Sequence, residues 1–589
     1  MPKEKIDINK IELDNEGFKK ALQIVQFTHN SLFLTGKAGT GKSTFLKYIA
    51  STTKKKHIIL APTGIAAINA GGTTLHSFFK LPFHPLLPND QQYSVRHIRQ
   101  TLKYNGEKSK LIREVELIII DEISMVRADM IDFIDKILRI YNRNMKEAFG
   151  GKQMLFVGDV YQLEPVLKAE DRKLLQNFYP SNYFFDAKVF QQFPLVSIEL
   201  SKVYRQTDPT FISILDRIRT NNTSESDLSL LNQHVQETDQ ENDTNDKMSI
   251  TLSTRRDTVD WINAQELDKL PDEAVTFNGN ITGEFPESSL PTSMELSLKV
   301  GAQIMFIKND SEKQWVNGTI GVIIGIDEDG GLLYIHTEDG ESLQVQREMW
   351  ENIRYHFNEQ EQKIEEELIG TFVQFPIKLA WAITVHKSQG LTFKNVVIDF
   401  SGGVFAGGQA YVALSRCTRL EGITLREPIK RKDIFVKSEV ANFAKHFNNE
   451  SIIQEALSQS KADKEYYDAA KAFDKGDFES FLDNFFLAIH SRYDIEQPVP
   501  KRLLRRKLHI INQLKEENKN IKEKFNKQNE FLKKLSMEYV IMGKECEREG
   551  MNQAAINNYK KALELCPENP KPKNRIAKLL SQNSENSNA

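Results

Sequence analysis

The residues best suited to chemistry form a glycine-rich turn between an apolar stretch and a helical one, at 33–49. Four residues separate Gly36 from the run Gly41, Lys42 and Ser43. This spacing predicts backbone N–H groups that cradle phosphates, a lysine that reaches the β and γ oxygens, and a hydroxyl that ligates Mg²⁺. A glycine-rich hairpin is the alternative, but an apolar strand before the turn and helical periodicity after it favour a nucleoside triphosphate site. The predicted contacts are Gly36, Lys37, Ala38, Gly39, Thr40, Gly41, Lys42, Ser43 and Thr44.

Two carboxylates and an amide follow other apolar runs. Asp121 and Glu122 end the strand-like stretch ELIIIDEISM at 116–125, and Gln162 lies beyond the stretch QMLFVGD. After a buried strand, Asp121 is placed to hold Mg²⁺ together with Ser43, and Glu122 to polarise an attacking water. Gln162 is placed to sense a γ-phosphate. A pair of helix-capping acids is the alternative, which the phosphate loop upstream disfavours.

Strand, turn and helix units must position these side chains. HIILAPTGIAAINA at 57–70 and ITLSTRRDTVDWINAQEL at 250–267 each read as a buried strand, a turn and a helix, the repeating unit of a parallel sheet. Ligands of such sheets lie beyond the carboxyl ends of the strands. Thr63 and Gly64 therefore lie on the functional edge of one sheet, and Thr254 on the edge of a second.

Other stretches leave alternatives open. In TTLHSFFKLP, His76 lies beside Phe78, which could stack on a base or belong to the core. The proline-rich, then polar segment 80–110 is either a solvated loop or a small subdomain that touches nucleic acid. Between 295 and 375, short strands alternate with turn residues, which predicts a small antiparallel barrel.

Composition limits the classes of protein. The chain has 589 residues, 40% of them hydrophobic, and a net charge of −3, so we expect several domains and, for any nucleic-acid partner, a local groove. Cys417, Cys546 and Cys566 have no paired spacing, which predicts neither a disulfide framework nor a zinc cluster and favours a reducing cytosol. We expect neither export nor a membrane span, since no signal core and no run of eighteen apolar residues occurs.

The region 445–589 is helical and charged. Residues 536–569 fit one tetratricopeptide repeat, and a poorer match lies near 469–488. A helix expected at 502–535 has near-heptad apolar spacing, but Asn518 and Gln528 interrupt it, so we expect no long coiled coil.

The ordered series of motifs is similar to that of superfamily one helicases and most resembles the Pif and RecD type, over residues 10 to 430. It comprises GKAGTGKST, APTGIAA, IIIDEISM, FGGKQMLFVGDVYQLEPV, LSKVYRQTD, LAWAITVHKSQGLTF and YVALSRCTRL. The resemblance implies an α/β protein with two RecA-like parallel-sheet motor domains, at 1–195 and at 196–294 with 376–440. It also implies an SH3-like β-barrel insertion at 295–375, and an all-helical tail completes the expected architecture.

The resemblance also implies roles for single residues. Arg205 and Arg416 match the arginines that reach the γ-phosphate from the second motor domain, and Gly390, with Gln389, matches the loop that couples nucleotide to DNA. At the place of the family's adenine-reading glutamine stands Lys19. The expected DNA contacts are Thr63, Gly64, His76, Phe78, Thr254, Thr384, His386, Lys387 and Ser388.

What the resemblance implies for function is an ATP-dependent DNA helicase with ATP and Mg²⁺ as cofactors. It would move 5′ to 3′ on single-stranded DNA and open tailed duplexes in replication, repair, recombination or telomere-type maintenance, in a bacterial-type cytosol. One alternative is a DNA-stimulated translocase that remodels protein–DNA complexes without unwinding. Another is an adaptor whose tetratricopeptide-like tail binds a protein partner and whose ATPase is a switch.

Overall fold

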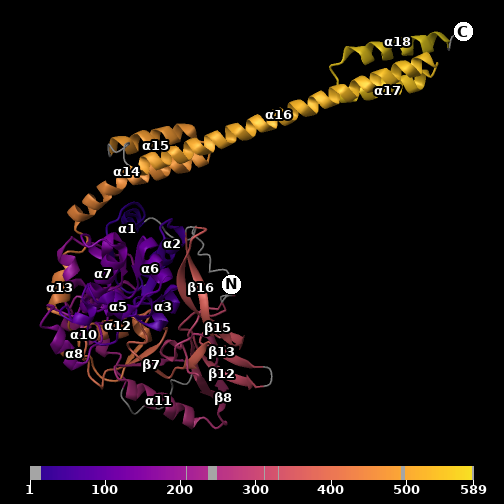
Figure 1. Ribbon diagram of the computed structural model, residues 1–589. Helices are drawn as coiled ribbons and strands as arrows, with labels where there is room; N and C mark the ends of the chain where they lie inside the picture. The colour runs from indigo at the N-terminus through magenta and orange to yellow at the C-terminus, as the bar shows by residue number, and fades with distance from the viewer. Residues whose placement is uncertain are drawn as a thin grey trace. The chain divides into compact units, whose positions relative to one another are not determined.

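The computed structural model describes residues 15–206, 208–236, 248–310, 312, 314–328, 331–361, 363–491 and 498–586. It divides into two compact units, Met1–Lys464 and Glu465–Ala589 (Figure 1). The spacing of Ile11, Leu13, Phe18, Leu22 and Val25 predicts a helix over 11–30, and the first two of these residues lie outside the described residues.

The first unit contains a six-stranded parallel sheet. Its order is β3-β2-β4-β5-β1-β6, and its strands are β1 (Leu32–Gly36), β2 (His57–Ala61), β3 (Thr73–Thr74), β4 (Leu117–Ile120), β5 (Gln153–Val157) and β6 (Val196–Leu200). Successive residues face opposite sides: Phe33 packs into one core, and Leu32 and Leu34 into the other. Because both faces are covered, these strands read as continuous apolar runs. Since β6 pairs with β1, the first lobe extends past the boundary that we predict at 195.

Helices cover both faces of this sheet. Segment 80–110 adds helices rather than a solvated loop, because Tyr93, Ile98 and Leu102 are buried in the same core as the sheet. The elements are α1 (Glu16–Phe27), α2 (Lys42–Thr52), α3 (Gly64–Ala70), α4 (Leu75–Phe79), η2 (Gln91–Tyr93), α5 (Ile98–Leu102), α6 (Gly106–Glu114), η3 (Ile123–Met125), α7 (Ala128–Asn142), η4 (Ala148–Gly151), α8 (Ala169–Leu175), η5 (Phe184–Asp186) and η6 (Lys188–Gln191).

A second parallel sheet has the order β18-β7-β19-β20. Its strands are β7 (Ile250–Ser253), β18 (Ala382–Thr384), β19 (Val396–Asp399) and β20 (Ile423–Leu425). The helices of this lobe are α9 (Pro209–Arg219), α10 (Glu225–Asn232), α11 (Arg256–Lys269), α12 (Gln409–Leu414), η8 (Leu420–Gly422), η9 (Arg431–Asp433) and α13 (Ser438–Ala444). The acidic, asparagine-rich run 221–247 predicts a mobile linker or a surface helix; part of it forms the helix α10, and residues 237–247 lie outside the described residues.

Antiparallel strands interrupt the second lobe. Five form one sheet, in the order β14-β13-β12-β11-β17, and a long hairpin of β15 and β16 pairs with β9. Figure 1 shows β12, β13, β15 and β16 gathered on one side of the first unit. The β region begins at Val275, before the expected 295, and its SH3-like character stays a prediction. The elements are β8 (Val275–Asn278), β9 (Asn280–Gly283), η7 (Glu287–Ser289), β10 (Glu295–Leu298), β11 (Gln303–Phe306), β12 (Ile320–Asp327), β13 (Leu332–Thr337), β14 (Ser342–Val345), β15 (Glu348–Asn358), β16 (Lys363–Gln374) and β17 (Ile377–Leu379).

The second unit is helical. A small core gathers Val540, Ala555, Tyr559, Ala562 and Leu579 from three successive helices. A Cβ at Gly543 would lie 2.5 Å from the Tyr559 ring, which is why a glycine stands there. The tetratricopeptide assignment stays a prediction. In the described residues no helix is long and apolar enough to cross a membrane. The helices are α14 (Glu450–Asp474), which begins in the first unit, α15 (Phe478–Ser491), α16 (Pro498–Arg548), α17 (Asn552–Leu565) and α18 (Pro570–Asn586).

Candidate active site between the two lobes

The phosphate loop joins the end of β1 to the start of α2. Gly36, Gly39 and Gly41 adopt φ values of +151°, +79° and +87°, of which the last two lie in the left-handed region that favours glycine. The ammonium group of Lys42 donates to the carbonyl oxygens of Gly36 at 2.6 Å and Lys37 at 2.9 Å, so it lies over the loop. Burial lowers the pKa of Lys42. The side chain of Lys37 forms an ion pair with Asp216 in α9.

The two acids follow β4 directly. The Asp121 carboxylate accepts a hydrogen bond from the backbone N–H of Glu122 at 2.9 Å. Burial raises the pKa of Asp121, and burial together with the Asp121 charge raises the pKa of Glu122 to about 7. Gln389, from the second lobe, donates to Glu122 Oε2 at 2.8 Å and to Gln162 Oε1 at 3.3 Å. One amide therefore joins the predicted base to the predicted phosphate sensor.

Two arginines approach from the second-lobe side of the cavity. Arg416 is 1% exposed, and it donates to backbone oxygens that include those of Val412 at 2.9 Å and Leu391 at 3.2 Å. Arg205 Nη2 donates to the Gly390 carbonyl at 3.3 Å, while Arg205 Nη1 is buried with no partner among the described residues. Burial lowers the pKa of Arg205, and burial with the Arg205 charge lowers the pKa of Arg416 to about 9. Both arginines line the cavity, and Nη1 of Arg205 is the nitrogen left without a partner that can bind an anion.

These groups surround one cavity of about 730 Å³. The structure brings together most of the predicted nucleotide and catalytic residues, and Asp121 lies next to Glu122 in the chain. Gly36 contributes through its backbone, because its carbonyl oxygen accepts a hydrogen bond from Lys42. Lys37 contributes through its backbone, because its side chain is turned to Asp216. The residues that line the cavity are Asn15, Phe18, Ala38, Gly39, Thr40, Gly41, Lys42, Ser43, Thr44, Glu122, Gln162, Tyr204, Arg205, Gly390, Thr392 and Arg416.

The residues of this cavity fit a triphosphate with Mg²⁺. The unpartnered nitrogen of Arg205 and the ammonium of Lys42 are donors for anionic oxygens. The Ser43 hydroxyl and the Asp121 carboxylate are oxygen ligands of the kind that Mg²⁺ prefers. The described residues contain no group of three or more His, Cys, Asp or Glu side chains able to hold a metal ion.

Sequence reasoning missed several contacts between the lobes. The Tyr411 hydroxyl, from α12, accepts a hydrogen bond from the backbone N–H of Ala38 at 3.0 Å. Arg219, at the end of α9, forms a buried ion pair with Asp159 at 2.9 Å and a partly buried one with Glu199 at 2.8 Å. Tyr411 and Asp159 lie within quoted motifs, but nothing local shows which distant group each one meets.

The adenine side of the cavity also differs from expectation. Lys19 is exposed on α1 and is not among the residues that line the cavity. Asn15 and Phe18, which precede it, do line the cavity. Tyr204 lies at the same cavity, and its N–H donates to the Gly39 carbonyl at 2.8 Å. These three residues are the better candidates for contacts with a base.

Of the expected DNA contacts, three keep an accessible place in the first lobe. Thr63 caps α3 by accepting from the Ala66 N–H at 3.2 Å, and Gly64 lies against Ser289. The His76 ring stacks on Phe83, with ring centroids 4.7 Å apart and the phenylalanine 83% exposed. That exposed aromatic was not foreseen.

Three more of the expected DNA contacts, Thr384, His386 and Lys387, are accessible in the second lobe. Lys387 is exposed, and its N–H donates to the Thr384 hydroxyl at 3.2 Å. His386 lies near the exposed ring of Phe405, with ring centroids 6.5 Å apart. These residues stay predicted DNA contacts.

For three others the structure corrects the expectation. Phe78 is 3% exposed in the core beside Tyr355, so its ring cannot stack on a base. The Ser388 hydroxyl is fully buried and donates to the Val385 carbonyl at 2.8 Å. The hydroxyl of Thr254 is buried too, in a residue that is 5% exposed. Their side chains are turned away from a strand at the surface.

Two parallel-sheet lobes that share one phosphate cavity define a P-loop ATPase with two RecA-like motor domains. Residues 14–229 match the model of the PIF1-like helicase family. The chain is 34% identical to human ATP-dependent DNA helicase PIF1 over 402 residues, 67% of this chain and 58% of the human protein. It is 30% identical to Pif1 of Bdellovibrio bacteriovorus over 446 residues, 75% of this chain and 93% of that protein. This chain therefore belongs to the PIF1-like helicase family, which confirms the resemblance.

Solved structures of related helicases agree with this family assignment. Pif1 from Bacteroides in complex with ADP-AlF4 has a TM-score of 0.66 and 39% sequence identity, and the match covers 73% of this chain and 96% of that one. Bacteroides Pif1 bound to single-stranded DNA gives a TM-score of 0.53 at the same identity, over 74% of this chain and 97% of that one. These matches confirm the two RecA-like lobes. The chain spans less than two thirds of the length of the human relative.

Proposed function

We propose that this protein is an ATP-dependent DNA helicase that moves 5′ to 3′ along single-stranded DNA and separates the duplex ahead of it. The observation that carries the proposal is the shared cavity, in which Lys42 and Glu122 from one lobe face Arg205 and Arg416 from the other. The names of the relatives support the substrate, since they are ATP-dependent DNA helicases. Bacteroides Pif1 was solved bound to single-stranded DNA, and another solved Pif1 structure concerns DNA unwinding at forked double-stranded DNA by two coordinating helicases.

Each residue at the cavity has a role that its position supports. Lys42 and the loop N–H groups bind the phosphates, and Ser43 with Asp121 holds Mg²⁺. Bound Mg²⁺ would neutralise charge on the phosphates. Glu122 accepts the proton of the attacking water, for which a pKa near the working pH is suited. Arginines that stabilise the transferred phosphoryl group are worth roughly 10³ to 10⁵ in rate.

Coupling to DNA follows from the second-lobe segment 384–390. Lys387 faces outward, whereas Gln389 reaches Glu122 and the Gly390 carbonyl accepts from Arg205. Closure around a bound nucleotide would therefore move the DNA-facing residues of one lobe relative to those of the other. Melting one base-pair step costs about 1.4 kcal/mol on average, so one hydrolysis event per nucleotide suffices.

The decisive experiment is ATP-dependent opening of duplexes that carry a 5′ or a 3′ single-stranded tail. We expect the 5′-tailed duplex to open and the 3′-tailed duplex to stay closed. Lys42→Ala should abolish opening, while Lys47→Ala, on the same helix and outside the cavity lining, should not. A translocase that only remodels protein–DNA complexes would hydrolyse ATP on single strands and leave both duplexes intact. An adaptor would keep its cellular role with Lys42→Ala.

We also propose a bacterial-type cytosol as the location, because relatives that this chain matches over 93% and 87% of their length occur in Bdellovibrio and Campylobacter. A protein partner for the tetratricopeptide-like helices, and a role in replication, repair, recombination or telomere-type maintenance, stay predictions. Fluorescent-fusion imaging tests the location: signal over the nucleoid supports it, and signal at the envelope contradicts it.

A further inference from the structure

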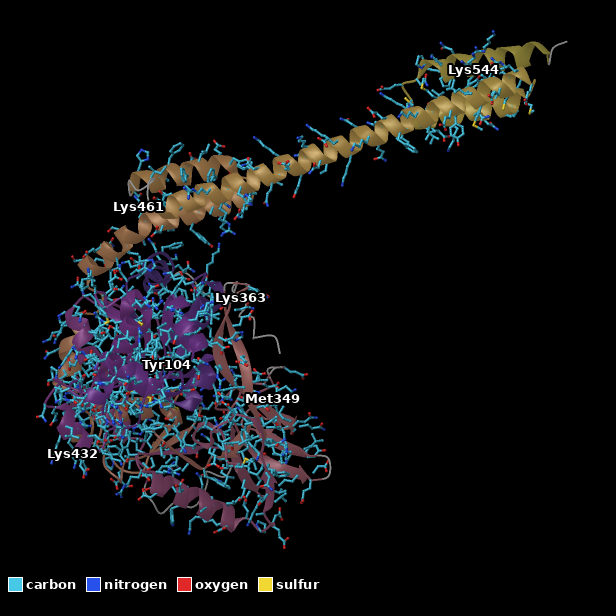
Figure 2. All side chains as sticks on the ribbon, in the orientation of Figure 1. Tyr104, Met349, Lys363, Lys432, Lys461 and Lys544 are labelled. Atoms are coloured by element: carbon cyan, nitrogen blue, oxygen red, sulfur yellow. The ribbon has the colours of Figure 1, made fainter. Side chains whose placement is uncertain are left out.

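The central part of α16 is a helix without a packed neighbour among the described residues. Every residue from 511 to 528 is exposed. Large apolar side chains are among them: Leu514 is 55%, Ile521 63% and Phe525 61% exposed. Figure 2 shows side chains spreading from all sides of this stretch. An isolated helix of this kind gains little from intrinsic propensity and normally buries its apolar stripe.

Six apolar residues and two amide residues together follow a strict heptad spacing. The steps between consecutive positions alternate between three and four residues without a break, over three and a half heptads. We name this stripe the seam; it consists of Ile511, Leu514, Asn518, Ile521, Phe525, Gln528, Leu532 and Leu535. The sequence alone suggested that Asn518 and Gln528 interrupt a coiled coil. The exposure of the whole stretch changes that interpretation, because one buried asparagine is the device that fixes register and strand number.

We propose that the seam binds the seam of a second copy of this chain, as a parallel, in-register two-stranded coiled coil. In that arrangement Asn518 meets the partner's Asn518, and Gln528 meets the partner's Gln528, so the polar side chains satisfy each other. The flanking charges agree: Glu517 of one chain lies beside Lys522 of the partner subunit, and the same pair recurs on the other side. The paired length, from Ile511 to Leu535, is about 36 Å at 1.5 Å per residue.

An antiparallel pair fits less well. Turning one helix round so that Asn518 faces Gln528 also keeps apolar residues opposite one another. It places Lys522 beside the partner's Lys522 and Lys524 beside the partner's Lys524, however, with no opposite charge between them. Like charges at these flanking positions disfavour that orientation. The charges thus select the parallel form.

The oligomeric state of the full chain tests the pairing. Sedimentation across micromolar concentrations should show a monomer–dimer equilibrium. Ile521→Lys should raise the dimer dissociation constant by at least about a hundredfold, because two buried isoleucines are lost per dimer. Ile541→Lys is the matched control: Ile541 is 55% exposed on the same helix but lies off the seam, so the constant should change by less than about threefold. A wild-type chain that stays monomeric, or equal effects of both substitutions, would overturn the proposal.

A charge exchange tests the orientation. Glu517→Lys and Lys522→Glu should each weaken the dimer, since each places like charges together across the parallel interface, and the double exchange should restore it. Failure of the double exchange to restore it overturns the parallel arrangement. Circular dichroism of each variant at low concentration checks that the helix itself is kept. ATP hydrolysis on single strands should be unchanged in all variants, which separates this proposal from that for the motor.

Discussion

Gly39→Ala tests whether the phosphate loop positions the arginine of the other lobe. Gly39 has φ +79°, and a Cβ there would lie 2.4 Å from the Arg205 Cβ and 3.2 Å from its backbone nitrogen. Since favourable carbon contacts begin at about 3.5 Å, the backbone that carries Arg205 must retreat by roughly 1 Å. A displacement of that size costs about 10²-fold in rate. We therefore expect kcat to fall by at least about 10²-fold, or about 2.7 kcal/mol of transition-state stabilisation.

The assay is steady-state ATP hydrolysis by the full chain with saturating single-stranded DNA. Gly71→Ala is the control, because Gly71 also has a left-handed φ, +72°, but a Cβ there meets nothing within 4 Å. It carries the same backbone strain of about 1–2 kcal/mol away from the cavity. Its kcat should stay within about twofold of the parent, because a strained surface cap acts on stability rather than on the reacting groups.

Combining Gly39→Ala with a substitution of Arg205 shows whether the first change acts through that arginine. Arg205→Gly removes the Cβ that an alanine at position 39 would meet, and the guanidinium with it. If Gly39→Ala acts through Arg205, adding it to Arg205→Gly should lower kcat by less than about threefold further. The two changes would then remove the same interaction. Rate losses that multiply would mean that Gly39 acts on the nucleotide directly, and the positioning argument would fail.

Three further substitutions have expected outcomes. Glu122→Gln should lower kcat by about 10² to 10⁴ while nucleotide binding persists, because an amide cannot take the proton; normal turnover would contradict this role. Phe78→Ala should lower the free energy of unfolding by about 3–5 kcal/mol in denaturant melts, and the exposed Phe83→Ala by less than about 0.5, so equal effects would refute the core assignment. Arg219→Met leaves the buried Asp159 carboxylate without its ion pair and should lower the free energy of unfolding by about 3–5 kcal/mol, partly recovered by adding Asp159→Asn. The thermal shifts of the single and the double variant relative to the parent check this, and no recovery would contradict the pairing.

Local patterns were enough to predict the parallel strands and the chemical groups at their ends. The run before Gly36 is apolar at every position because β1 is buried on both faces, and the same holds for the run before Asp121. Strands of this kind end at the edge where ligands bind, so the residues after them are the ones that act. The lysine, the acids and the glutamine amide are all of this type.

Contacts between distant segments could not be predicted in this way. Whether Phe78 is core or surface depends on Tyr355 in β15, which packs against it from 277 residues further along the chain. The boundary at 195 was misplaced because β6 finds its partner in β1, while its own apolar pattern fits either lobe. For Tyr411, the apolar pattern indicates a buried helix. It does not show that the Tyr411 hydroxyl accepts a hydrogen bond from the backbone N–H of Ala38.

In the segment 384–390, the direction in which each side chain points matters more than the type of residue. Lys387 and Gln389 are two residues apart, yet one faces solvent and the other reaches across to Glu122. The side-chain oxygen Oε1 of Gln389 is buried without a partner among the described residues, so this amide is held by the hydrogen bonds of its Nε2 alone. The segment that carries predicted DNA contacts is therefore joined to the predicted base through one hydrogen bond, and the order of the residues alone cannot show it.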